Sequence, residues 1–302
     1  MLVRHVKRKS LIGGLLLASL LPAAPADALT VPGRNGDVAI ASHVDCGGLG
    51  CNTRAAITIV GPDGRGARRT RCPFGCADPA QNLNFAPDRR RLVLSAGSTK
   101  VGVLDLKTRK TKVLKGIQAW DIDWSPDGKQ LRYVDPRTFD LYSARPDGRG
   151  VRRLTTGSNV REAAASPTGH IAIKDALPAR GPSQGNFRPA GNIYVFNART
   201  GTRRLIASAT PASDVSLIGW TARGRLWFVD GTGASRSIAA DGSGERAEAK
   251  PSGAVAFSPD GRRLAAAEPQ AVWATSLGLR HVKRLLRTSS TSSVPAVAWA
   301  RR

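Results

Sequence analysis

The sequence predicts an all-β fold, a six-bladed β-propeller of four-stranded antiparallel blades. The first observation is a turn signature, an aromatic or small residue before a Ser-Pro-Asp-Gly-like run, that recurs at intervals of 37 to 55 residues. Repeats near 40 residues are typical of four-stranded units stacked in a ring. The second observation is that 296–300 repeats the strand that precedes each turn, so it can complete the N-terminal blade and close the ring. The copies of the signature lie at 85–88, 124–128, 165–169, 220–224 and 257–261.

Each unit has the same order of strands and turns. A short strand ends in the signature, where Pro presets φ, Asp bonds to nearby backbone and Gly supplies a positive φ. A second strand follows, as at 130–134, and then a third strand, another turn and a fourth strand, as at 141–145 and 151–155. These runs of β-forming or small residues are too short for helices.

Counting the units predicts one propeller domain over 29–302. The chain enters the ring inside a unit, because 36–41 resembles a second strand, and the missing first strand is found at the C-terminal end. The predicted blades are blade 1 over 36–78 with 295–300, blade 2 over 79–117, blade 3 over 118–158, blade 4 over 159–210, blade 5 over 211–250 and blade 6 over 251–290.

Residues 1–28 are predicted to be a cleaved, Sec-type secretory signal peptide. Basic residues lie between Arg4 and Lys9, an apolar stretch covers 11–21, and 26–28 has the Ala-x-Ala pattern of a cleavage site. The apolar stretch is far shorter than the roughly 20 residues that a membrane-spanning helix needs. We therefore expect no membrane span after processing and a secreted or extracytoplasmic location, in the periplasm or cell envelope.

All four cysteines lie in the predicted first blade. An even number in an exported chain predicts two disulfides. A zinc site is the competing hypothesis, although only His43 accompanies the cluster. Three pairings are compatible with the sequence; local pairs are favoured, and a cross-link between the two loops stays open. The residues are Cys46, Cys51, Cys72 and Cys76.

With the turns at 124–128 and 257–261, the chain resembles the TolB-like family of six-bladed propellers, whose WD-like repeats carry an [FW]-S-P-D-G turn. The resemblance covers about 30–302 and implies the propeller fold. It says little about activity, because the same repeats occur in TolB, in the propeller caps of prolyl-oligopeptidase-like peptidases and in many secreted proteins. TolB carries a further N-terminal domain, for which we expect no room ahead of this propeller.

The charge of the chain is strongly positive. The formal net charge is +24, the aromatic content is 5%, and the basic residues are mostly Arg spread through turns and fourth strands. A nucleic-acid-binding surface concentrates its charge and interleaves aromatic residues, so no nucleic acid partner is expected. An anionic cell-envelope polymer is a compatible partner, besides a protein or peptide. We expect a monomer.

Candidate ligand-binding residues come from the first strands, which line the channel of a propeller. Three consecutive blades place amides and acids there, whereas the other three place Leu, Gly or Ala. These groups either bond to backbone and water near the strand starts or hold Ca²⁺ or a ligand amine. The residues are Asn82, Asn84, Asp121, Asp123 and Glu162.

A second candidate is an insertion in blade 4, over 176–190, that joins the second and third strands. A loop of this length is uncommon unless it is functional or disordered. The segment between Cys46 and Cys51 joins the equivalent strands of blade 1, across the ring. Both loops are expected on one face, with Phe187 and Arg188 as ligand contacts; a tolerated excursion is the alternative.

No catalytic motif accompanies these features. The sequence has no G-x-S-x-G elbow, P-loop, H-E-x-x-H pair or dinucleotide fingerprint. We therefore expect a non-catalytic exported binding or scaffold protein with no resident cofactor, which uses one propeller face to hold a protein, peptide or envelope ligand. The alternative is a Ca²⁺-dependent propeller hydrolase, such as a lactonase-like or glycan-cleaving enzyme, with Asp121, Asp123 and Glu162 as its acids.

Overall fold

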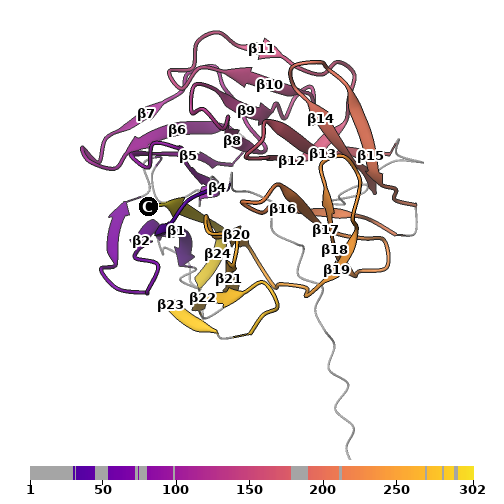
Figure 1. Ribbon diagram of the computed structural model, residues 1–302. Helices are drawn as coiled ribbons and strands as arrows, with labels where there is room; N and C mark the ends of the chain where they lie inside the picture. Colours follow the sequence, from indigo (N-terminus) through magenta and orange to yellow (C-terminus); the bar gives the residue numbers. More distant parts are fainter. Residues whose placement is uncertain are drawn as a thin grey trace, which may run out of the picture.

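A ring of six four-stranded antiparallel sheets is formed by the residues that the computed structural model describes (Figure 1). This confirms the all-β, six-bladed propeller that the repeat predicts. The described residues are 30, 32–44, 54–71, 74, 80–97, 99–177, 190–210, 213–268, 271–280, 282–288 and 292–302.

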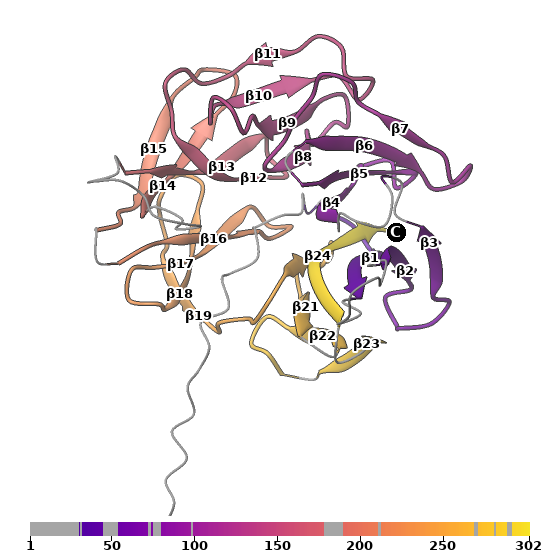
Figure 2. The same cartoon turned by 180° about the vertical axis from the view of Figure 1, so that it is seen from behind.

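The C-terminal strand closes the ring, as predicted. Strand β24 (Ser292–Arg301) pairs antiparallel with β1 (Asn35–Val44), and the sheet continues through β2 (Arg54–Val60) and β3 (Arg68–Arg71). Figure 2 shows the C-terminus lying beside β1 on the view from behind. Closure removes the edges that an open stack of sheets would expose.

The other five blades are simple meanders in chain order. Blade 2 contains β4 (Ala80–Phe85), β5 (Arg91–Ala96), β6 (Lys100–Asp105) and β7 (Thr111–Val113). Blade 3 contains β8 (Ile122–Trp124), β9 (Leu131–Val134), β10 (Leu141–Ala144) and β11 (Arg152–Arg153). Blade 4 contains β12 (Val160–Ala165), β13 (His170–Ala176), β14 (Gly191–Asn197) and β15 (Arg203–Ala207). Blade 5 contains β16 (Ser216–Trp220), β17 (Arg225–Val229), β18 (Ser235–Ala239) and β19 (Arg246–Glu248). Blade 6 contains β20 (Val255–Phe257), β21 (Arg263–Glu268), β22 (Ala271–Ser276) and β23 (Lys283–Arg287).

The repeated turn is held by its own side chains. In blade 3, the Ser125 hydroxyl donates to the Asp127 carboxylate at 2.6 Å, and the Gly128 N–H donates to the Ser125 carbonyl at 2.8 Å. Gly128 has φ +68°, a value that favours glycine. Ser258 and Asp260 make the same 2.6 Å contact in blade 6. The Ser-Pro-Asp-Gly repeat is therefore a requirement of the turn between the first and second strands.

The core lies between successive blades. Leu92 and Leu94 on β5 pack in a cluster shared with blade 1, whereas Val93, between them, packs in a cluster shared with blade 3. Successive side chains of a strand point to opposite faces of its sheet, so each blade is buried on both faces. In that second cluster, Trp124 is fully buried and its Nε1–H donates to the Asn84 carbonyl of blade 2 at 3.1 Å. Apolar packing and such bonds fix the angle between neighbouring blades.

Candidate functional site

One face of the ring carries the starts of all the innermost strands. Strands β4, β8, β12, β16, β20 and β24 lie nearest the centre (Figure 1). Because every blade has four antiparallel strands, each innermost strand starts on the same face. We call this the entry face; it also carries connections between second and third strands, such as 135–140, and the two ends of the blade 4 insertion, Leu177 and Ala190.

The two candidate amides lie on β4 and reach into the next blade. The Asn82 side chain donates to the Trp120 carbonyl at 2.8 Å and to the Ser95 hydroxyl at 3.0 Å. The Asn84 side chain donates to the Ile122 carbonyl at 2.8 Å. Both asparagines are about 1% exposed. Each amide thus joins the innermost strand of blade 2 to that of blade 3.

The three candidate acids continue this pattern around the channel. Asp121 accepts the Ala163 N–H at 2.9 Å, and Asp123 accepts the Ala165 N–H at 3.2 Å, which joins blade 3 to blade 4. Glu162 accepts the Leu217 N–H at 2.8 Å, which joins blade 4 to blade 5. Buried backbone groups require such partners where no β-ladder supplies them.

The five polar residues therefore form one structural unit, a chain of side-chain-to-backbone bonds across blades 2 to 5. Aligning the repeats of this sequence with one another places these residues on consecutive innermost strands, and the structure brings them together there. Each of them makes at least one hydrogen bond to the next blade, and they are all buried. Contact with a ligand stays a prediction for this set.

A buried lysine stabilises the acidic end of the unit. Lys174 on β13 is 0% exposed; its Nζ lies 2.6 Å from Asp214 Oδ2 and 3.5 Å from Glu162 Oε1. Asp214 also accepts the Gly191 N–H at 3.1 Å. A buried ammonium needs such anionic partners, because burial without them is costly. The repeat pattern of the sequence did not indicate Lys174. A lysine within the apolar run of β13 is the sequence signal that could have indicated it.

The blade 4 insertion begins and ends on this anchored base. The Leu177 N–H donates to the Ala190 carbonyl at 2.7 Å, next to the contact between Gly191 and Asp214. Phe187 and Arg188 lie outside the described residues, as do Cys46, Cys51, Cys72 and Cys76. Their predicted roles, in ligand contact and in disulfides, stay predictions.

Arg161 is a half-buried cation at the entry face. It precedes Glu162 on β12, and its guanidinium carbon lies 3.7 Å from the ring centroid of Phe139 in blade 3. Its Nε atom is buried without a hydrogen-bond partner, and no carboxylate of the described residues pairs with it. Burial lowers the pKa of the Arg161 guanidinium, which still stays charged at neutral pH.

The Phe139 ring is held in place under this guanidinium. Phe139 has φ +53°, and its carbonyl accepts the Val160 N–H at 2.8 Å, directly beside Arg161. A cation stacked on an aromatic ring is stabilised without using its hydrogen-bond donors. Arg161 is therefore an oriented cation whose N–H donors are not all used within the protein. The arginines are spread through the sequence, so the sequence alone did not distinguish Arg161 from the others.

Neither a metal centre nor a membrane helix is found in the part of the chain that the structure describes. There, no three His, Cys, Asp or Glu side chains are grouped so that they could hold a metal ion. Likewise, no helix in the described ranges has the length and apolar character needed to cross a membrane.

Comparison with known proteins gives similarity in structure only. No protein-family model and no curated protein matches the sequence. TolB from Acinetobacter baumannii is similar with a TM-score of 0.68 and 18% identity, over 90% of this chain and 68% of that chain. A chain of a nidogen/laminin complex gives a TM-score of 0.64 and 15% identity, over 88% and 98% of the two chains. A putative TolB from Agrobacterium tumefaciens gives 0.61 and 16%, over 77% and 88%. At these identities the similarity shows the fold: the chain has the six-bladed β-propeller found in the TolB structures.

Proposed function

We propose that this chain is a non-catalytic, exported binding protein that holds a protein, peptide or cell-envelope ligand on its entry face. Export is supported by the basic, apolar and Ala-x-Ala segments of residues 1–28. Binding is supported by the rigid ring, which presents loops from several blades on one face.

The observation that carries the proposal is the state of Arg161. The buried acids and amides of the entry face have backbone partners in the next blade, so they serve the frame. The Arg161 guanidinium is oriented by Phe139, and its Nε lacks an acceptor. Because Arg161 is only half-buried, other N–H donors of its guanidinium can meet acceptors on a bound ligand. Carboxylate or carbonyl oxygens are suitable acceptors.

A calcium-dependent hydrolase has less support. Such a site needs several convergent oxygen ligands, and the carboxylates of Asp121, Asp123 and Glu162 accept hydrogen bonds from backbone N–H groups instead. Calorimetric titration with Ca²⁺ separates the two functions. A saturable heat that Asp121→Ala/Asp123→Ala abolishes would favour the hydrolase.

The entry face is tested by capture of ligand from cell-envelope extracts of the source organism. We expect Arg161→Ala to reduce capture at least tenfold, because an oriented cation of the site is lost. Replacing 178–189 by an Asn-Gly turn is expected to reduce capture as well, because it removes the proposed contacts Phe187 and Arg188. The Asn-Gly turn suits a two-residue hairpin between Leu177 and Ala190.

Arg152→Ala is the matched control, because Arg152 is exposed on the outermost strand of blade 3. Thermal unfolding checks that each variant keeps the ring. Equal capture by the wild-type protein and both entry-face variants would show that the ligand binds elsewhere.

A further inference from the structure

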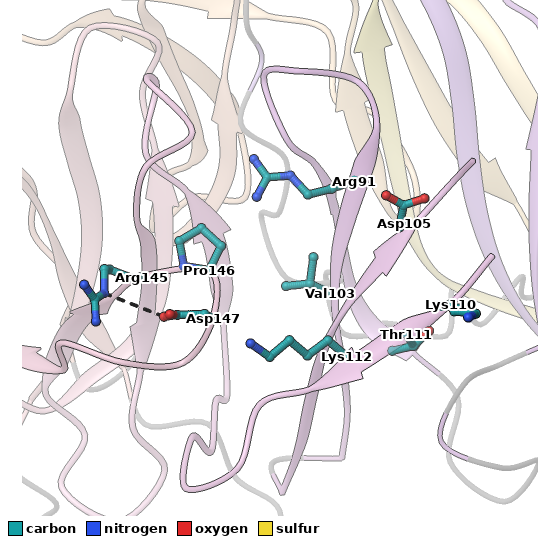
Figure 3. A pocket seen from close by; sticks show the side chains of 9 residues that line it. All are labelled: Arg91, Val103, Asp105, Lys110, Thr111, Lys112, Arg145, Pro146 and Asp147. Atoms are coloured by element: carbon teal, nitrogen blue, oxygen red, sulfur yellow. Dashed lines mark ion pairs between the residues drawn. The ribbon is translucent and has the colours of Figure 1, made fainter. Parts of the chain in front are cut away.

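A cleft of about 550 Å³ opens at the seam between blades 2 and 3, on the face opposite the entry face (Figure 3). Its blade 2 wall comes from the start of β5, the end of β6 and the start of β7. Its blade 3 wall is the turn 145–147, which follows β10. Figure 3 shows Arg91 and Lys112 reaching from blade 2 toward this turn, with Val103 between them. Four separate segments of sequence therefore build one cleft.

Cations outnumber acids in this cleft. Four cationic side chains line it, against two carboxylates. The Asp105 carboxylate accepts the Thr108 N–H at 2.7 Å, and the Asp147 carboxylate accepts the Arg149 N–H at 2.9 Å. These bonds lower the pKa of both carboxyl groups and occupy them within their own turns. The cationic residues are Arg91, Lys110, Lys112 and Arg145.

The two lysines are the uncompensated charges. Arg145 lies 3.7 Å from Asp147, and Arg91 lies 2.7 Å from Asp88. Lys110 and Lys112 are exposed, and neither forms an ion pair with a carboxylate of the described residues. Both side chains therefore remain available to an anion from solution.

Arg91 is oriented before any ligand binds. Its Nε donates to Asp88 at 2.7 Å, and its guanidinium carbon lies 4.8 Å from the ring centroid of Trp124 in blade 3. The guanidinium thus keeps its place at one end of the cleft. An oriented guanidinium loses little conformational entropy when it binds an anion.

We propose that this cleft binds the phosphate groups of a linear phosphodiester polymer. A phosphate can accept both from the guanidinium N–H groups that Asp88 and Asp147 leave open and from the two ammonium groups, whereas a carboxylate offers fewer oxygens. Val103 and, on the blade 3 wall, Pro146 are apolar and suit the carbon linkers between phosphates. Val103 is 8% exposed at the base of the cleft, so the cleft admits a chain rather than the flat surface of a bilayer.

Poly(glycerol phosphate) is the probe, and its binding to the full propeller is measured by calorimetry over a range of salt concentrations. We expect Lys110→Gln/Lys112→Gln to weaken binding about tenfold. We also expect the slope of the logarithm of the binding constant against the logarithm of salt concentration to become shallower by about one to two, since two contacts to phosphate are lost. Poly-glutamate of matched charge is expected to bind more weakly than poly(glycerol phosphate).

The control variant is Lys115→Gln/Lys283→Gln, which removes two exposed lysines outside the cleft and leaves the same net charge. An equal loss in this control would overturn the proposal, because binding would then follow the overall charge of the protein. Binding to phosphatidylglycerol vesicles but not to the polymer would also overturn it, in favour of lipid headgroups.

The proposals for the cleft and for the entry face can be tested independently. Arg161→Ala is expected to leave the affinity for poly(glycerol phosphate) unchanged, because Arg161 lies on the opposite face. Lys110→Gln/Lys112→Gln is expected to leave envelope capture by the entry face unchanged. A loss of both properties in either variant would contradict the assignment of two sites.

Discussion

Where the blades of this propeller meet at the channel, single side chains make the hydrogen bonds to backbone that a β-ladder makes elsewhere. Innermost strands of neighbouring blades diverge too far to pair, yet they bury backbone groups that need partners. Asn84 donates to a carbonyl of the next blade, whereas Asp123 accepts from an N–H. The choice between amide and acid therefore follows the backbone group that each residue faces.

This reasoning predicts that Asn84→Asp destabilises the ring, although the two side chains have nearly the same shape. The new carboxylate would face the Ile122 carbonyl oxygen, which accepts from Asn84 at 2.8 Å in the native protein. We expect a loss of about 2–4 kcal/mol in the free energy of unfolding, measured by chemical denaturation.

Asn197→Asp is the matched control. Asn197 uses its side-chain oxygen to accept the Arg199 N–H at 3.0 Å, a role that a carboxylate also fills. We expect a change within about 0.5 kcal/mol there. Similar losses at both positions would argue against the role of Asn84 in joining blades.

At the scale of elements, the turns and connections are stabilised by hydrogen bonds between an acidic side chain and groups a few residues away. The connection between β17 and β18 is the strongest case. Asp230 accepts the Thr232 hydroxyl at 2.5 Å, the Thr232 N–H at 2.9 Å and the Arg236 guanidinium at 2.9 Å. The Thr232 hydroxyl and then Arg236 lower the pKa of Asp230 to about 2.

This shift gives blade 5 a defined response to acid. The pKa of Asp230 is lower in the folded protein than the ordinary value of about 3.9. Its stabilising effect is therefore complete above about pH 4 and is lost as the pH falls through about 2. We expect Asp230→Asn to unfold at lower temperature at pH 7 and to match the wild-type protein near pH 2. A difference between the two proteins that does not change with pH would exclude this mechanism.

At the scale of the whole molecule, the ring depends on a strand supplied from the other end of the chain. Val297 and Trp299 on β24 are buried in the cluster between blades 6 and 1. The Trp299 Nε1–H donates to the Gly36 carbonyl at 3.1 Å. A Cβ atom at Gly36 would lie 2.6 Å from the Arg301 carbonyl oxygen, so β1 and β24 approach closely there.

Removing 296–302 is therefore expected to cost much of the stability of the propeller. The truncation exposes an edge of β1 and opens the interface between blades 6 and 1. Differential scanning calorimetry measures the loss, and a synthetic peptide of 292–302 added in excess is expected to restore part of it. An unchanged unfolding temperature would refute closure by this strand. Trp299→Phe, which loses the bond to Gly36 and part of a buried ring, is expected to cost about 1–3 kcal/mol.

Much of the frame could be predicted because its causes are local. The turn at 124–128 needs Ser, Asp and Gly at set positions for its own hydrogen bonds and φ values, so the repeat marks blades 2 to 6. The continuous buried run of strands such as β5 then follows from the burial of both faces. The alignment of repeats also placed Asn82 and Asp121 at equivalent strand starts.

The partners of these residues could not be predicted, because they lie about forty residues away in the next blade. Asp121 bonds to Ala163, and Arg161 stacks on Phe139, only because the ring sets two blades at a fixed angle. The cleft between blades 2 and 3 likewise joins Arg91, Lys112 and Pro146. No pattern within one repeat contains these pairs.

The sequence by itself determined the strands, the turns, the number of blades and the closing strand, since each depends on neighbouring residues or on the repeat. Only the tertiary structure decided which polar groups serve the frame and which face solvent. The reason is physical: a hydrogen bond or an ion pair depends on distances between blades, and those distances exist only once the ring has closed.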